Sequence, residues 1–94
     1  MSTTKTEHII YESGAEAWFC NNDLGWRILH RNDGPAYKDS YSNQYWYLYG
    51  KLHNLNGPAV IERGGYTRWY IDGKKIDCQS QEEFEQYKKL IAFI

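Results

Sequence analysis

Histidines, cysteines and acidic residues are the side chains of this 94-residue chain that could do chemistry, and their spacing favours structural roles. His30 and His53 lie 23 residues apart, without cysteines or carboxylates at metal-ligand spacing. Cys20 and Cys78 carry no local signature of a Cys–His nucleophile and are too few for a disulfide framework. We therefore expect reduced thiols, no metal, no cofactor, and histidines that order their neighbouring Asp-Gly-Pro turns.

The acidic residues do not predict catalysis either. Asp33, Asp39, Glu62 and Asp72 could supply a carboxylate pair for acid–base work. However, Asp33 and Asp72 stand at turn positions, where Asp is favoured for backbone reasons. The sequence has no phosphate-binding loop, dinucleotide fingerprint or helix–turn–helix spacing. We expect a protein that is not an enzyme.

The charge balance disfavours polyanionic partners. Eleven Lys and Arg oppose twelve Asp and Glu, and acids interleave with aromatics as often as bases do. A nucleic acid is therefore an unlikely partner. No apolar run is long enough for a membrane span, so we expect no membrane association. The start of the chain lacks a secretory apolar stretch, which predicts a cytoplasmic location.

An internal repeat organises the chain. The segment 29–36, Leu-His-Arg-Asn-Asp-Gly-Pro-Ala, matches 52–59, Leu-His-Asn-Leu-Asn-Gly-Pro-Ala, at an offset of 23 residues. The same offset relates Trp46 to Trp69, and the Gly-Lys pair at 50–51 to the pair at 73–74. A wider leading copy begins at Trp18, with about five extra residues before position 29.

Local patterns predict two strands and two turns in each copy. Residues 44–49 and 66–71 alternate with a period of two, which is typical of β-strands. Asp72-Gly73 predicts a type I′ hairpin turn, with Tyr49-Gly50 as its weaker equivalent. In the Asp33-Gly34-Pro35 and Asn56-Gly57-Pro58 turns, we expect glycine to take a positive φ and proline to begin the next strand.

The C-terminal segment changes to a helical pattern. Ser80 and Glu83 form a predicted capping box, and an apolar stripe follows at Phe84, Tyr87, Ile91 and Ile94. We expect this helix, over 80–93, to cover a face or an end of the sheet. The predicted fold is mainly β (α+β): an antiparallel β-meander of 23-residue hairpin repeats with one C-terminal α-helix. A single domain, 1–94, would contain an N-terminal hairpin start (1–17), the repeats (18–77) and the helix.

Strand parity predicts two unlike faces. Trp46 and Leu48 share one side, as do Trp69 and Ile71, and we place these residues in the core. The opposite side carries residue types that are enriched in protein interfaces; the predicted partner-binding residues are Tyr45, Tyr47, Tyr49, Tyr66, Arg68 and Tyr70. Alternatively, the helix or a longer rolled sheet covers these tyrosines.

The repeat motif resembles a known family. Segment 29–36, followed by Tyr-Trp-Tyr-Leu-Tyr-Gly-Lys-Leu-His at 45–53, is similar to the Leu-His-Arg-Glu-Asp-Gly-Pro-Ala hairpin repeats of bacteriophage and giant-virus proteins. Those repeats are distantly similar to MORN-type and YwqK-type hairpins. The resemblance covers residues 18–77. Asn32 departs from the family's Glu, and Asn54-Leu55-Asn56 departs from its Arg-Glu-Asp.

The resemblance implies a function through viral origin. We expect a phage-encoded, anti-CRISPR-like inhibitor that contacts a component of a host defence system in the host cytoplasm. One alternative is a sponge that sequesters a nucleotide second messenger. Another is a structural repeat or virion component. A homodimer through sheet edges is also compatible with the pattern.

Overall fold

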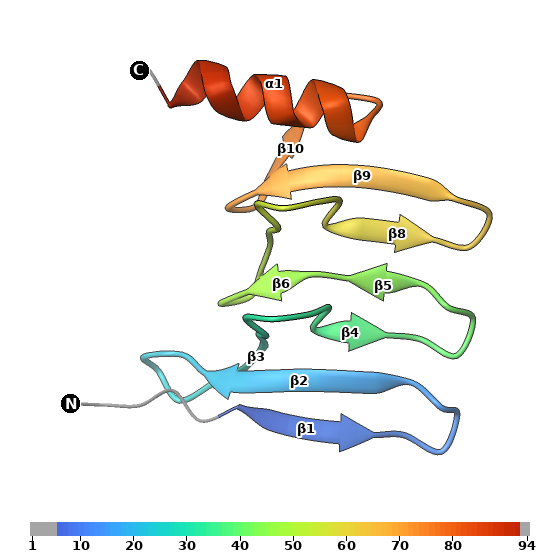
Figure 1. Ribbon diagram of the computed structural model, residues 1–94. Helices are drawn as coiled ribbons and strands as arrows, with labels where there is room; N and C mark the ends of the chain where they lie inside the picture. The colour runs from blue at the N-terminus through green and yellow to red at the C-terminus, as the bar shows by residue number, and fades with distance from the viewer. Residues whose placement is uncertain (1–5, 93–94) are drawn as a thin grey trace.

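The computed structural model describes residues 6–92 and has a mainly antiparallel β fold with one C-terminal helix, as the sequence predicts (Figure 1). Its elements follow one another as a stack of hairpins with the helix at one end. Their bounds are β1 Glu7–Ile10, β2 Glu16–Asn21, β3 Arg27–Leu29, β4 Tyr37–Lys38, β5 Gln44–Tyr45, β6 Tyr47–Leu48, β7 Lys51–Leu52, β8 Val60–Glu62, β9 Tyr66–Ile71, β10 Lys74–Ile76 and α1 Gln81–Ile91.

The stack is thin and has two halves. One half is the antiparallel ladder β1-β2-β4-β5-β8-β9, in which the N-terminal parts of β2 and β9 pair with the short strands β4 and β8. The other half contains the hairpins β2–β3, β6–β7 and β9–β10. The molecule measures 38 × 37 × 17 Å, so a single layer of sheet forms most of it.

The main-chain groups of Trp18 and Trp46 join the two halves of the stack. The Trp18 N–H donates to the Ala36 carbonyl at 2.8 Å, and the Trp18 carbonyl accepts from His30 N–H at 2.9 Å. Trp46 makes the same two bonds, to the Ala59 carbonyl at 2.7 Å and from His53 N–H at 2.9 Å. The hydrogen bonds change partner at this residue, which is why the predicted strand 44–49 is divided into β5 and β6.

The histidine side chains hold a different turn from the one predicted. His30 Nδ1 accepts the Tyr49 N–H at 2.9 Å, and His53 Nδ1 accepts the Asp72 N–H at 2.9 Å. Both donors are the first residue of the turn in the following hairpin. Tyr49 and Asp72 have φ values of +49° and +51°, and each precedes a glycine of positive φ. The type I′ prediction is therefore confirmed for these two turns.

The glycine-proline turns differ from the prediction. Neither Gly34 nor Gly57 has a positive φ. A Cβ on Gly34 would lie 2.7 Å from Arg31 Cζ, so this glycine makes room for the guanidinium. That guanidinium donates to the Pro35 carbonyl at 3.2 Å, whereas the equivalent Asn54 amide donates to the Pro58 carbonyl at 3.0 Å. The prolines precede the strands β4 and β8 rather than beginning them.

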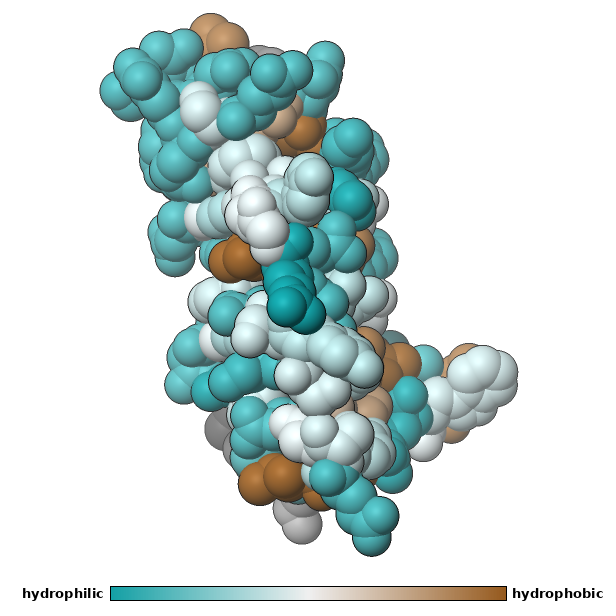
Figure 2. Space-filling view, turned by 90° about the vertical axis from the view of Figure 1, so that its right-hand side faces the viewer, coloured by the Kyte–Doolittle hydropathy of each residue, from teal (hydrophilic) through white to brown (hydrophobic). Residues whose placement is uncertain are grey.

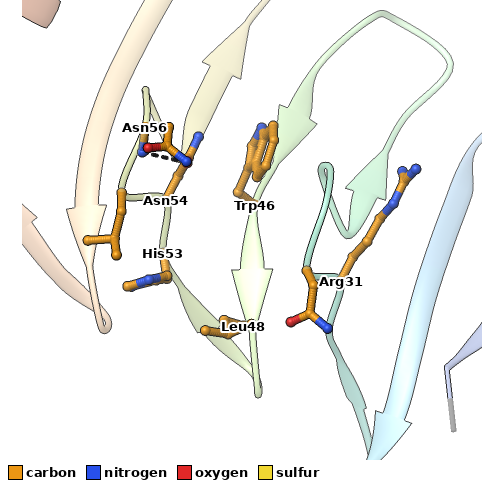
Figure 3. A pocket seen from close by; sticks show the side chains of 8 residues that line it. Arg31, Trp46, Leu48, His53, Asn54 and Asn56 are labelled. Carbon is orange, nitrogen blue, oxygen red and sulfur yellow. Dashed lines mark hydrogen bonds between the residues drawn. The ribbon is translucent and has the colours of Figure 1, made fainter. Parts of the chain in front are cut away.

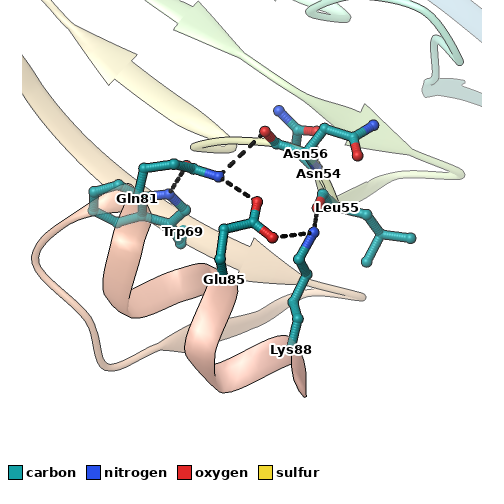
Figure 4. A network of polar contacts seen from close by, with 7 residues as sticks. All are labelled: Asn54, Leu55, Asn56, Trp69, Gln81, Glu85 and Lys88. Carbon is teal, nitrogen blue, oxygen red and sulfur yellow. Dashed lines mark hydrogen bonds and ion pairs between the residues drawn. The ribbon is translucent and has the colours of Figure 1, made fainter. Parts of the chain in front are cut away.

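The contiguous apolar core lies at the helix end of the stack. Trp69, Ile76 and Phe84 form it, and Trp69 is only 4% exposed. The helix begins after Ser80, whose side chain accepts from Glu83 N–H at 3.2 Å, as the capping box predicts. Figure 4 shows the polar contacts that fix α1 to the stack: Trp69 Nε1 donates to Gln81 Oε1 at 2.9 Å, Gln81 Nε2 to the Asn56 carbonyl at 3.3 Å, and Lys88 Nζ to the Leu55 carbonyl at 2.6 Å.

The rest of the predicted helical stripe is more open. Tyr87 and Ile91 are exposed to a similar degree, because only the first turns of α1 face the core. The predicted extension to 93, with Ile94, lies outside the described residues. The helix covers the end of the sheet, so the tyrosine side does not lie beneath it.

Candidate functional site

A cluster of phenol, carboxylate and guanidinium groups lies on one face of the β5–β8–β9 ladder. Val60 stands opposite both Tyr45 and Arg68 in the strand register, and directly paired residues share a face. Tyr45 OH donates to Glu62 Oε2 at 3.0 Å, and Arg68 Nη2 donates to Glu62 Oε1 at 3.0 Å. One carboxylate therefore fixes two of the predicted partner-binding residues.

Tyr66 completes this surface. It stands opposite Glu62 in the register and has the same parity as Arg68 along β9. Its side chain is 70% exposed. We call Tyr45, Glu62, Tyr66 and Arg68 the tyrosine–arginine patch. Burial, and then the bond to Glu62, raises the pKa of Tyr45, so its phenol stays protonated and acts as a donor within the patch.

The other three predicted partner-binding residues lie elsewhere. Tyr47 and Tyr70 are half-buried in the hairpin half of the stack, and their carbonyls accept from Arg31 and Asn54 N–H at 3.1 Å each. Tyr49 is exposed, but it belongs to a turn at the opposite end from Tyr66, and its ring lies 4.1 Å from that of His30. The structure therefore brings together only half of the predicted set.

Two further tyrosines, which are not among the residues predicted from the sequence, extend the exposed surface. Tyr11 and Tyr41 stand in the β1–β2 and β4–β5 turns, and Tyr66 directly follows the β8–β9 turn. Tyr41 is 65% exposed. These three turns form one edge of the stack, and Figure 2 looks onto that edge, where pale residues of intermediate hydropathy occupy much of the surface. A tyrosine beside each of three successive turns was the signal in the sequence.

Trp46 lies beside a hollow rather than in the core, which corrects the prediction for it and for Leu48. The hollow measures about 190 Å³, and Trp46, Leu48 and His53 line it together with the loops at 31–32 and 54–56. Figure 3 shows the indole between Arg31 and Asn54. Its Nε1 is buried and has no hydrogen-bond partner, whereas the equivalent atom of Trp69 is paired with Gln81.

The indole of Trp18 is covered by the side chains of His8 and Arg31. The His8 ring lies 4.2 Å from the indole and nearly parallel to it, and the Arg31 guanidinium lies 3.9 Å from it. His8 comes from β1 and Arg31 from the loop after β3, on the two sides of β2. The hollow beside these residues, about 370 Å³, therefore offers no free indole face on which a nucleotide base could stack.

The cysteines are free, and the described part of the chain has no cluster of potential metal ligands. Cys20 is buried and Cys78 half-buried, both are free, and burial raises the pKa of each thiol, which opposes thiolate formation. Within residues 6–92, no three His, Cys, Asp or Glu side chains gather as metal ligands. Over the same range, no helix has the length and apolarity needed to cross a membrane.

Comparison with known proteins adds no relative. No protein-family model, curated protein or solved structure matches the chain.

Proposed function

We propose that this chain is a non-enzymatic binding protein that recognises another protein through the tyrosine–arginine patch. The observation that carries the proposal is the Glu62 carboxylate, which accepts from both Tyr45 and Arg68 at 3.0 Å beside the exposed Tyr66 ring. Tyrosine and arginine are among the residue types that contribute most to interface hot spots.

Preorganisation supports this proposal. Tyr45 and Arg68 are tethered to a carboxylate on neighbouring β8, so binding would freeze fewer rotamers than free surface side chains require. Because the Arg68 and Glu62 charges already pair, an interface can cover them without leaving either charge alone. The patch combines large apolar area with donors whose directions are set.

The finer proposal is that the partner is a component of a bacterial defence system, and that a phage supplies this chain as its inhibitor. The similarity of the 29–36 and 52–59 segments to viral hairpin repeats supports it. The protein would then act in the host cytoplasm. Tyr11 and Tyr41 would widen the contact along the edge of the stack.

A capture experiment tests the proposal. The tagged chain is exposed to lysate of a bacterium that carries a defined defence system, and the captured protein is purified and titrated by calorimetry. Tyr66→Ala and Arg68→Ala should each weaken binding by about tenfold or more. Thr67→Ala, an exposed residue of opposite parity between them, should bind like the wild type. Equal binding by all three variants would refute the role of the patch.

A further inference from the structure

The turn between β2 and β3 presents two large apolar side chains to solvent. Leu24 is 77% exposed and Trp26 is 68% exposed. The turn spans five residues, 22–26, whereas Tyr49-Gly50 and Asp72-Gly73 make the equivalent turns with two residues each. The three extra residues thus build a tip that the two equivalent turns, at 49–50 and 72–73, lack.

Asn22 holds this tip in one conformation. Its Oδ1 accepts from Leu24 N–H at 3.0 Å and from Trp26 N–H at 2.9 Å. Its backbone N–H donates to the Trp26 carbonyl at 2.8 Å, and its carbonyl accepts from Gly25 N–H at 2.9 Å. Gly25 has a φ of +81°, which an L-residue rarely adopts. Four hydrogen bonds therefore preorganise a loop whose two large apolar side chains are mostly exposed.

The charges around the tip indicate what it fits. Asp23 is exposed next to Leu24, and Arg27, which follows Trp26, lies 3.8 Å from Glu7 and over the Phe19 ring. A carboxylate at the tip opposes insertion into lipid, since a buried Asp costs about 2.5–3.5 kcal/mol in a membrane. The same carboxylate favours a partner surface with a cationic group beside an apolar pocket.

A second copy of this chain is a poorer fit. The hollow at Trp46 holds only about 190 Å³, and its apolar residues share the lining with three asparagines, His53 and Arg31. The hollow at Trp18 has one apolar residue, Trp18 itself, and there Asp33 opposes any attraction of Asp23 to Arg31. Neither hollow is therefore a predominantly apolar pocket large enough for an exposed leucine together with an indole.

We propose that the 22–26 tip is an anchor that inserts Leu24 and Trp26 into an apolar pocket with a basic rim on a partner protein. The proposal rests on the proposed function, because it takes the chain to be a protein-binding protein, and it adds a second contact remote from the tyrosine–arginine patch. The tip lies on the edge of the stack that is opposite the β1–β2, β4–β5 and β8–β9 turns (Figure 1). The patch lies near those turns, on β5, β8 and β9.

The test uses the full chain and the purified protein that the wild-type chain captures from lysate. Leu24→Ser and Trp26→Ser should each weaken binding by about 30-fold or more, the loss typical of a hot spot. Leu90→Ser, a similarly exposed leucine on α1, is the matched control and should bind normally. Asn22→Ala keeps both anchors but frees the tip, so its loss should be smaller and appear with an unchanged thermal midpoint. Asp23→Asn should reduce the salt dependence of binding.

Direct observation of Trp26 separates the outcomes. Its indole N–H resonance, assigned by Trp26→Phe, should shift or broaden when the captured protein is added. If the tip variants bind like the wild type while Tyr66→Ala fails, the anchor is refuted and the proposed patch stands. If only the tip variants fail, the patch is refuted and the anchor stands. Binding of the wild-type chain to phosphatidylethanolamine–phosphatidylglycerol vesicles, or tip-dependent self-association in light scattering, would overturn the proposed occupant, and so would failure to capture any protein.

Discussion

Gln81 fixes the helix to the sheet, and its replacement should lower the free energy of unfolding. Its carboxamide accepts the Trp69 indole N–H at 2.9 Å and donates to the Asn56 carbonyl at 3.3 Å, so it joins α1 to both the core and the loop between β7 and β8. We predict that Gln81→Met, which keeps the side-chain length and a similar helix propensity, destabilises the fold.

The size of the effect follows from the indole. Trp69 is 4% exposed, so its N–H loses its acceptor in a site that water reaches poorly. An unpaired buried donor costs about 1–3 kcal/mol. Because Gln81 itself is only half-buried, we expect about 1–2 kcal/mol. For a domain of this size, that loss lowers the thermal midpoint by about 4–16 °C.

Thermal and urea unfolding measure the change, and two comparisons isolate its cause. Gln86→Met replaces an exposed glutamine of the same helix and should leave the midpoint unchanged. A double-mutant cycle of Gln81→Met with Trp69→Phe should give a coupling of about 0.5–1.5 kcal/mol. Equal stability of Gln81→Met and the wild type, or a coupling near zero, would show that the indole does not depend on this acceptor.

Two further predictions concern the repeated turns. Burial lowers the pKa of His30 below its usual value of 6.5, so the unfolded chain takes up this proton first as the pH falls. The free energy of unfolding should therefore decrease below about pH 6.5, by up to about 1.4 kcal/mol per pH unit. His30→Gln should flatten this part of a plot of urea midpoint against pH. Parallel plots for the variant and the wild type would contradict the role of His30 in this pH dependence. Gly73→Ala places a methyl group at a φ of +84° and should cost about 1–2 kcal/mol in unfolding free energy. Gly57→Ala, where φ is not positive and the nearest side-chain atom is 3.6 Å away, should be close to neutral; an equal loss for both would show that backbone strain is not the cause.

Local signals predicted the last hairpin well. The alternation of 66–71 predicted the bounds of β9, Tyr66–Ile71, and the Asp72-Gly73 pair predicted the turn that connects it to β10, Lys74–Ile76. The same alternation failed at 44–49, because the backbone of Trp46 changes partner from Ala59 to His53. This change of hydrogen-bond partner depends on which strands flank the residue, so an alternation of polar and apolar residues cannot predict it.

Burial of the tryptophans and the position of the tyrosines depended on tertiary neighbours. Parity grouped Trp46 with Leu48 correctly, yet α1 covers only Trp69, so Trp46 lines a hollow. Parity also grouped Tyr49 with Tyr45, but a positive φ directs Tyr49 into a turn beside His30. The patch itself depends on Glu62, whose role becomes visible only when β8 lies between β5 and β9.

The residue at position 76 differs from those at positions 30 and 53, and the helix rather than another hairpin follows it. His30 and His53 each stand beside a tryptophan and accept a backbone N–H from the following hairpin, whereas Ile76 stands opposite Trp69 and contacts Phe84 of the helix instead. An imidazole suits a position that another hairpin follows, and an aliphatic side chain suits one that the helix follows. A designer who adds one more hairpin before the helix would accordingly place histidine at position 76 and move the isoleucine, with its helix, to the new end.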